Sequence, residues 1–164
     1  MKKTIVIYGS STGTCESIAQ LIGDKLGVEI IAAADITADK VAEYDNLLLG
    51  SSTWGDGEMQ DDWYDAINEV KGADLTGKTI ALFGCGDSES YSDTFCDAIG
   101  VLYDELKDTG ATFIGAVSAD GYNFSSSISV VDGNFIGLAI DDVNESDLTE
   151  ERVDNWIASI QDQL

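Results

Sequence analysis

Four hydroxyl side chains stand close together near the N-terminus, in the stretch Gly9-Ser10-Ser11-Thr12-Gly13-Thr14-Cys15-Glu16. The stretch contains no Lys or Arg, follows a short apolar run and precedes a segment of helical period, with Thr12 or Thr14 as the expected N-cap. A loop between a buried strand and a helix offers free backbone N–H groups and the positive end of the helix dipole. We therefore expect a phosphate monoester held by neutral donors, although a Ser/Thr-rich turn that only caps the helix fits the same residues.

Two other loops each carry one aromatic side chain among small residues. Trp54 lies in Ser51-Ser52-Thr53-Trp54-Gly55-Asp56-Gly57-Glu58, and Tyr91 lies in Cys85-Gly86-Asp87-Ser88-Glu89-Ser90-Tyr91-Ser92-Asp93. An aromatic side chain in such a loop either lies exposed at a rim or stacks on a flat ring. Two of them beside an anion-binding loop favour a planar, phosphorylated cofactor.

A third glycine-containing stretch, Gly72-Ala73-Asp74-Leu75-Thr76-Gly77-Lys78-Thr79, matches the pattern of a nucleotide-triphosphate loop. That pattern requires a strand before it and a helix after it. Here a helical segment precedes and an apolar run follows, so we interpret the stretch as a connecting turn.

Acidic residues concentrate in the same two aromatic loops. Five lie between Gly55 and Asp65 and four between Asp87 and Asp97, with no Lys or Arg in either interval. Carboxylates around a redox cofactor disfavour added negative charge on it and lower its last reduction potential. They also keep a surface solvated, and both effects can hold together.

The elements that must position these loops follow from the hydrophobic pattern. Short apolar runs alternate with segments of helical period, which is typical of a parallel sheet covered on both faces. We expect strands over 4–8, 28–32, 46–50, 79–84 and from 111 onward, with helical segments over 14–26, 37–44, 59–70, 95–106 and 153–164. Residues 118–134, rich in Gly, Ser, Asn and Asp, are expected as an excursion inserted into the fifth strand, which resumes at 135–139.

The composition limits the number of domains, the kinds of partner and the classes of catalysis. A chain of 164 residues with 44% hydrophobic residues fits one domain, 1–164. Its net charge of -23 argues against nucleic acid and anionic membranes and favours basic protein partners. The absence of His excludes Ser-His-Asp and Cys-His catalysis. The three cysteines include no CxxC pair, so we expect no metal site. The N-terminal apolar run is too short for a signal peptide, so we expect a cytoplasmic protein with reduced thiols.

Together the three loops resemble those of the flavodoxins of the long-chain type, small electron carriers that bind FMN. The Ser-Ser-Thr-Gly loop, Thr53-Trp54 with Gly57, and Gly86-Asp87 with Tyr91 carry the resemblance, which covers the whole chain. It implies a doubly wound α/β fold with a five-stranded parallel sheet, order 2-1-3-4-5, in a three-layer αβα arrangement. The excursion in strand five would mark the long-chain class.

The resemblance also implies roles for individual residues. The FMN phosphate would be held by Ser10, Ser11, Thr12, Gly13, Thr14 and Cys15, and Trp54 and Tyr91 would flank the isoalloxazine ring. The ring and ribityl chain would be lined by Thr53, Gly55, Gly57, Cys85, Gly86, Asp87, Thr94 and Cys96. The family commonly has Asn-Thr where this chain has Thr14-Cys15, so a thiol stands where a hydroxyl is expected.

The function implied is that of a low-potential one-electron carrier, not an enzyme. It would be a monomer that receives electrons from a basic partner such as an NADP-dependent flavodoxin reductase and passes them to redox enzymes. An FMN-dependent NAD(P)H quinone or nitro reductase on the same fold is the alternative, and it would need cationic groups for the dinucleotide. A signalling receiver would need clustered acids where this chain has the hydroxyl loop.

Overall fold

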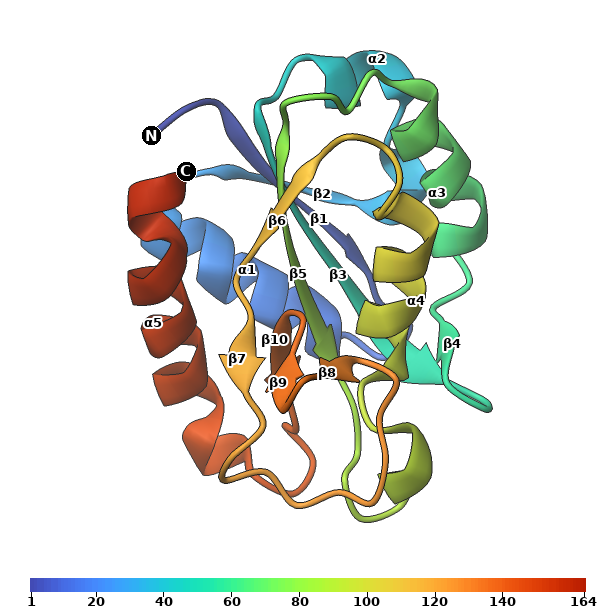
Figure 1. Ribbon diagram of the computed structural model, residues 1–164, viewed down its shortest axis with the longest axis vertical. Helices are drawn as coiled ribbons and strands as arrows, with labels where there is room; N and C mark the ends of the chain where they lie inside the picture. Colours follow the sequence, from blue (N-terminus) through green and yellow to red (C-terminus); the bar gives the residue numbers. More distant parts are fainter.

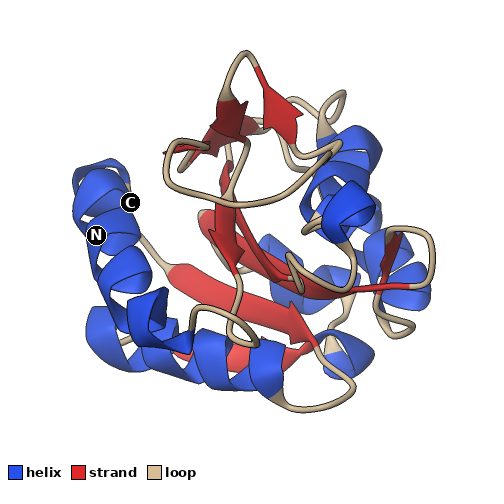
Figure 2. Cartoon of the chain, turned by 90° about the horizontal axis from the view of Figure 1, so that it is seen from below, coloured by secondary structure: helices blue, strands red, loops and turns tan.

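The computed structural model describes residues 1–164 and has a central parallel sheet with helices on both faces (Figures 1 and 2). Its strands are β1 (Thr4–Gly9), β2 (Glu29–Ala32), β3 (Asn46–Trp54), β5 (Thr79–Cys85), β6 (Thr112–Ile114) and β10 (Leu138–Ile140). They run in the spatial order β2-β1-β3-β5, with β6 and β10 both beside β5. This is the predicted order 2-1-3-4-5, with β6 and β10 sharing the fifth position.

Helices cover the sheet as two layers. The α-helices are α1 (Thr14–Leu26), α2 (Ala38–Ala42), α3 (Trp63–Gly72), α4 (Asp97–Leu106) and α5 (Thr149–Ile160). Short 3₁₀ turns span Ala33–Asp35, Ser92–Thr94, Ser146–Leu148 and Gln161–Gln163. Successive side chains of a strand point to opposite faces, so Ile5 and Ile7 join the core under α3 and α4, whereas Val6 joins the core under α1 and α5. Because both faces of the sheet are covered by helices, its strands need apolar residues at successive positions.

The fifth strand is interrupted, as the sequence predicted. β6 pairs with the first half of β5, and β10 pairs with its second half. Between them residues 115–137 leave the sheet and form a small antiparallel sheet of β7 (Val117–Ser118), β8 (Val130–Val131) and β9 (Asn134–Phe135). The expected return to the central sheet at Phe135 is wrong, because Phe135 pairs with Val117 and Val130.

The start of the third helical segment also differs from the expectation. Met59 does not belong to the third helical segment: it lies in β4 (Glu58–Met59), which pairs antiparallel with the end of β3. It is buried in the same core as Trp63, four residues later, and that spacing imitates a helical turn. The stretch Gly72–Thr79 joins α3 directly to β5, which confirms the connecting turn.

Candidate functional site

The loops after β1, β3 and β5 meet at the carboxyl ends of these strands and enclose a cavity of about 210 Å³. Ten of the predicted site residues line it: Thr12, Thr14, Thr53, Trp54, Gly55, Cys85, Gly86, Asp87, Tyr91 and Thr94. In doubly wound sheets this edge is where ligands bind. The cavity is therefore the candidate site.

The loop after β1 leaves backbone donors free at the start of α1. Its N-cap is Gly13, in the left-handed conformation with φ of 94° and without a side-chain cap. The prediction that Thr12 or Thr14 caps the helix is therefore wrong; instead the Gly13 amide donates to Ser10 Oγ at 3.1 Å. The first intrahelical bond runs from the Ser17 amide to the Gly13 carbonyl, 2.9 Å. The three amides before Ser17 have no partner inside the helix, so they remain available for an anion.

Two cysteine thiols, those of Cys15 and Cys85, lie close to each other near this loop. Cys15 is fully buried in the core under α1, so its side chain points away from the cavity, whereas Cys85 lines it. A hydrogen bond with the Cys15 thiol, together with burial, raises the pKa of Cys85 well above its ordinary value. The Cys85 thiol is therefore uncharged at neutral pH.

The loop after β3 supplies the first aromatic wall. Trp54 is 41% exposed, and its indole N–H donates to Ser52 Oγ at 2.8 Å. A tight turn follows, closed by a bond from the Gly57 amide to the Trp54 carbonyl, with φ of +52° at Gly55. Positive φ at the first central position is where glycine is favoured.

The same turn rests on Asp97 at the start of α4. A Cβ added at Gly57 would lie 2.6 Å from Asp97 Oδ2, so only glycine fits there. Asp97 is buried, and desolvation raises the pKa of its carboxyl group above the usual range. Its Oδ1 accepts from the Ile128 amide at 2.9 Å, which ties the turn to the excursion.

Thr53 has a second use. Its Oγ1 accepts from the Ala98 amide at 3.2 Å and so partners one of the free donors at the start of α4. The side chain both lines the cavity and fixes a helix end.

The loop after β5 supplies the second aromatic wall. Tyr91 is 60% exposed, and its amide donates to the Asp87 carbonyl at 2.9 Å. Bonds from the Ser90 amide and the Asn144 side chain hold the pKa of Asp87 below its usual range. A Cβ at Gly86 would lie 2.8 Å from the Cys96 backbone nitrogen, which explains the glycine.

Six predicted residues lie outside the cavity lining: Ser10, Ser11, Gly13, Cys15, Gly57 and Cys96. Ser11 Oγ accepts from Gln60 Nε2 at 3.0 Å, which ties the first loop to the segment after β4. Cys96 is buried with its thiol 3.9 Å from the Gly84 carbonyl oxygen, behind Gly86. Ser11 and Cys96 therefore help to fix the loops around the cavity without lining it.

Three lining residues were missed by the sequence reasoning: Ser52, Asp142 and Val143. Asp142 and Val143 lie two and three residues after the end of β10, at the same edge as the other loops. The rule that placed the site at the strands' carboxyl ends would have found them, had it been applied to the resumed fifth strand.

A larger cavity, about 410 Å³, lies between α5 and the excursion. The guanidinium of Arg152 in its wall already bonds Glu145 at 3.2 Å and lies 4.0 Å from the Tyr122 ring centroid. The N-cap of α5, Leu148, also lines this cavity, but the first turn of that helix carries the acidic residues Glu150 and Glu151. No pair of exposed aromatic side chains faces the cavity. It is therefore unfavourable for an anion and lacks the stacking surfaces of the candidate site.

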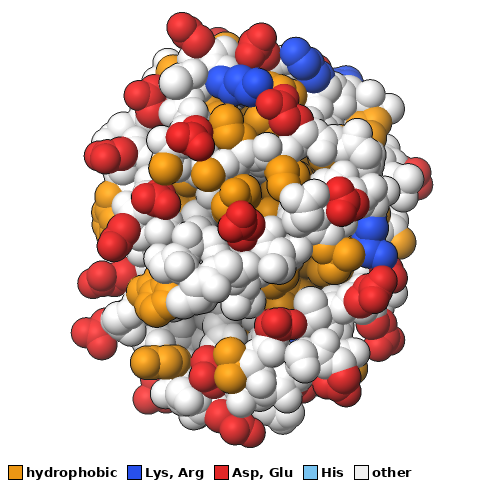
Figure 3. Space-filling model, turned by 180° about the vertical axis from the view of Figure 1, so that it is seen from behind, with side chains coloured by type: hydrophobic (Ala, Val, Ile, Leu, Met, Phe, Trp, Pro, Cys, Tyr) orange, Lys and Arg blue, Asp and Glu red, His pale blue; other side chains and the backbone are white.

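Acidic side chains are exposed in and after the loops that form the candidate site. Asp56, Glu58, Asp61 and Asp65 are exposed after β3, and Glu89 and Asp93 are exposed after β5. Asp97 belongs to the same predicted group but is buried, so it adds nothing to the surface. On the face in Figure 3, most of the Lys and Arg side chains lie toward the upper end, near α2 in Figure 1, and acidic side chains are spread over the whole face.

Known proteins resemble this chain over its whole length. Flavodoxin 1 of Azotobacter vinelandii is 42% identical and covers 100% of this chain and 98% of its own length. Flavodoxin 1 of Escherichia coli K12 is 41% identical over 100% of this chain and 96% of its own length. A crystal structure of Fusobacterium nucleatum flavodoxin bound to flavin mononucleotide superposes with a TM-score of 0.93 at 29% identity, covering 100% and 99% of the two chains. Since the flavodoxin family model also matches residues 6–156, this chain belongs to the flavodoxin family.

Proposed function

We propose that this protein binds FMN in the cavity at the carboxyl ends of β1, β3 and β5 and carries single electrons at low potential. The observation that carries the proposal is one cavity that joins unpartnered amides of α1 to two exposed aromatic side chains. FMN has a phosphate for the first feature and a flat ring for the second. The related Fusobacterium protein, whose structure contains flavin mononucleotide, supports the assignment.

The phosphate belongs at the start of α1. The amides of Thr14, Cys15 and Glu16 precede the first intrahelical bond, and Thr12 and Thr14 present hydroxyls at the cavity. Hydrogen bonds to a charged acceptor are stronger than neutral ones, and the helix dipole adds to them. A cradle of residues 10–15 can therefore hold a phosphate without Lys or Arg, through the amide of Cys15 and not its buried thiol.

The ring belongs between Trp54 and Tyr91. Offset stacking on an aromatic side chain adds about 0.5 to 1.5 kcal/mol beyond area burial. Thr53, Gly55, Cys85, Gly86, Asp87 and Thr94 line the space between the aromatic residues and the cradle, where the ribityl chain would run. Gly57 and Cys96 do not line the cavity: Gly57 packs against Asp97, and Cys96 packs against Gly86.

FMN supplies the redox chemistry, since its ring accepts electrons one at a time. The protein's part is electrostatic. The exposed carboxylates around the site, with no cation in either acidic interval, disfavour negative charge in the cavity and so lower the last reduction potential. Gly55 lies in a tight turn and lines the cavity. Rotation of the Gly55-Asp56 peptide toward the ring would let the Gly55 carbonyl accept a hydrogen bond from a ring N–H.

The same carboxylates select the partners. A net charge of -23 attracts a basic redox protein such as an NADP-dependent flavodoxin reductase and repels nucleic acid. None of the helices combines the length and apolar character needed to cross a membrane. We infer a cytoplasmic monomer that meets its donor and its acceptor in turn.

Charge steering has a direct test. Electron transfer from a basic reductase should slow as salt rises, because the screening length falls from about 30 Å at 0.01 M to about 10 Å at 0.1 M. Asp61→Lys or Asp65→Lys should slow the encounter and leave FMN affinity unchanged, because neither residue lines the cavity. A rate independent of salt would exclude steering.

The function itself is tested by anaerobic reductive titration of the FMN-loaded protein, followed by its visible spectrum. We expect two separate one-electron steps, with the second at low potential, and no NAD(P)H oxidation by the protein alone. A single two-electron step with turnover of NAD(P)H would instead establish the quinone or nitro reductase activity.

A further inference from the structure

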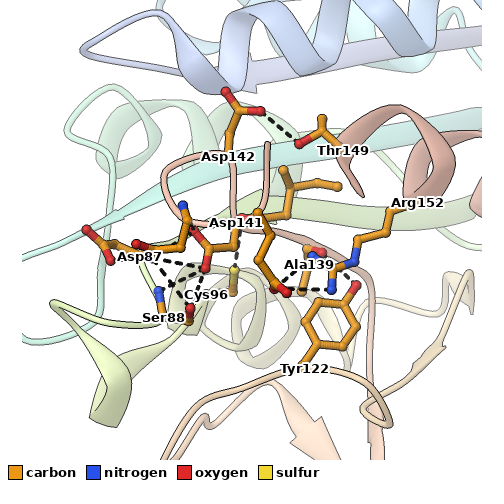
Figure 4. Close-up of polar contacts among 12 residues, drawn as sticks. Asp87, Ser88, Cys96, Tyr122, Ala139, Asp141, Asp142, Thr149 and Arg152 are labelled. Atoms are coloured by element: carbon orange, nitrogen blue, oxygen red, sulfur yellow. Dashed lines mark hydrogen bonds and ion pairs between the residues drawn. The ribbon is translucent and has the colours of Figure 1, made fainter. Parts of the chain in front are cut away.

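A carboxylate that is fully buried follows β10 directly. Asp141 has no exposed surface, and its oxygens accept from the backbone amide and the hydroxyl of Ser88 and from the amide and side chain of Asn144 (Figure 4). The Ser88 amide lies at 3.3 Å and the Asn144 amide at 3.0 Å. A buried charge is tolerated only when hydrogen bonds satisfy it. Asp141 therefore holds these two loops in one fixed arrangement.

Asn144 extends the arrangement to the cavity wall. Its side-chain Nδ2 donates to Asp87 Oδ1 at 2.8 Å, and the same oxygen accepts from the Ser90 amide at 3.0 Å. Tyr91 is bonded in turn to the Asp87 carbonyl. A continuous series of hydrogen bonds thus runs from Asp141 to the loop that carries the second aromatic wall.

The far side of the loop after β10 is also fixed. The Glu145 amide donates to the Asp141 carbonyl at 3.0 Å, and Arg152 of α5 bonds the Glu145 carboxylate. Arg152 lies over the ring of Tyr122, whose hydroxyl donates to the Ala139 carbonyl at 2.8 Å (Figure 4). The loop after β10 is therefore fixed by hydrogen bonds on both sides.

We propose that Asp141 and Asn144 are positioning residues that hold the wall formed by residues 86–91 against the flavin ring. The inference rests on the proposed function. Neither residue lines the cavity, so they act through Ser88 and Asp87. The loop 87–91 is short and mostly polar, so it has few apolar contacts that would hold it in place. Without the bonds from Asp141 and Asn144 it could open at little cost.

The test compares three variants of the full chain in their affinity for FMN and for riboflavin. Asp141→Asn places an amide N–H₂ group against the N–H donors of Ser88 and Asn144. Asn144→Ala removes the bond to Asp87, and because Asn144 is exposed the variant should still fold. We expect dissociation constants for both ligands to rise by one common factor, on the order of tenfold for Asp141→Asn and several-fold for Asn144→Ala. The ratio between FMN and riboflavin affinity should stay constant, because the hydrogen bonds of the loop 10–15 run to Ser17 and Gln60 and not to Asp141 or Asn144.

Asp147→Asn is the matched control. It removes the same charge from the same segment, and its exposed side chain takes part in none of these hydrogen bonds. Both affinities should equal those of the parent protein. An equal loss in Asp147→Asn and Asp141→Asn would show a charge effect and overturn the positioning role, as would a loss of FMN affinity alone.

Amide hydrogen exchange of the flavin-free protein separates this inference from the proposed function. The amides of Ser90 and Tyr91 should exchange faster in Asn144→Ala, with those of α1 unchanged. If the parent protein bound no flavin, the proposed function would fail and this exchange would still decide whether the support holds the loop. Unchanged exchange at Ser90 and Tyr91 would overturn the inference.

Discussion

The proposed phosphate loop, residues 10–15 after β1, and the wall after β5 that carries Tyr91 line the same cavity but differ in what fixes their backbone amides. In the loop after β1, the Gly13 amide donates to Ser10, three residues away, and one long-range bond joins Ser11 to Gln60. The wall that carries Tyr91 is held from a distance, since Ser88 and Asp141 are 53 residues apart and Asp87 and Asn144 are 57 residues apart. One region uses the start of a 13-residue helix, and the other uses an exposed side chain on a supported loop.

This difference separates two kinds of sensitivity. In the proposed site, phosphate binding would depend on amides that α1 fixes by its own geometry, so substitutions elsewhere should leave it unchanged. Ring binding would depend on the position of a loop that is held by residues from another part of the chain. The following substitutions test that separation, in order of decreasing expected effect.

Thr12→Ala removes a hydroxyl from the phosphate side of the cavity. We expect FMN binding to weaken by about 1 to 3 kcal/mol, the range for a lost hydrogen bond to a charged group. Riboflavin binding should stay the same, and Thr12→Ser should restore FMN affinity. Equal losses for FMN and riboflavin, measured by fluorescence titration, would place Thr12 at the ring instead.

Tyr91→Ala removes one stacking surface and should weaken FMN and riboflavin binding equally, by at least the about 0.5 to 1.5 kcal/mol that stacking adds beyond area burial. It should also raise the lower reduction potential, because stacking favours the uncharged oxidised ring. Tyr91→Phe keeps the ring and should retain both properties. Tyr64, another exposed tyrosine, does not line the cavity, so Tyr64→Ala should change neither. Unquenched flavin fluorescence in the parent protein would contradict the stacking.

Gly55→Thr places a β-branched residue where φ is +52°. The strain, on the order of 1 kcal/mol, should hinder rotation of the Gly55-Asp56 peptide toward the ring and bring the two one-electron potentials closer together. Gly77→Thr adds comparable strain at φ of +81° in the turn before β5, far from the site. It should lower stability alone, so a shift of the potentials in both variants would refute the assignment.

Asp97→Asn tests the buried carboxylate under the Trp54–Gly57 turn. Burial raises its pKa, so the folded state holds the proton more tightly than the unfolded state does. The parent protein should therefore lose stability relative to Asp97→Asn as the pH rises above about 4 and through the folded-state pKa. Urea unfolding of both proteins from pH 3 to pH 7 measures the difference, and a constant difference would show that Asp97 does not titrate in this range.

Sequence reasoning succeeded where the deciding contacts are local. The strands' apolar runs, the phosphate loop and the two aromatic loops are each set by neighbouring residues, and all three loops line one cavity. It placed Met59 in a helix because a buried strand residue four positions before Trp63 has the same spacing as a helical turn.

The support of the second wall could not be predicted in the same way. Asp141 and Asn144 follow an interrupted strand, and nothing in their own segment indicates that Ser88 and Asp87 lie beside them. That contact depends on β10 pairing with the second half of β5. Similarly, the thiol of Cys15 points into the core because of its position on α1, which the identity of the residue does not reveal.

The most direct test of the central claim is the ratio of FMN to riboflavin affinity in the unmodified protein, measured by equilibrium titration of the flavin-free chain. The two ligands differ only in the phosphate. Several charge-assisted hydrogen bonds at the start of α1 predict that FMN binds on the order of a hundredfold more tightly or better. Equal affinities, or no binding of either flavin, would contradict the assignment of this cavity to FMN.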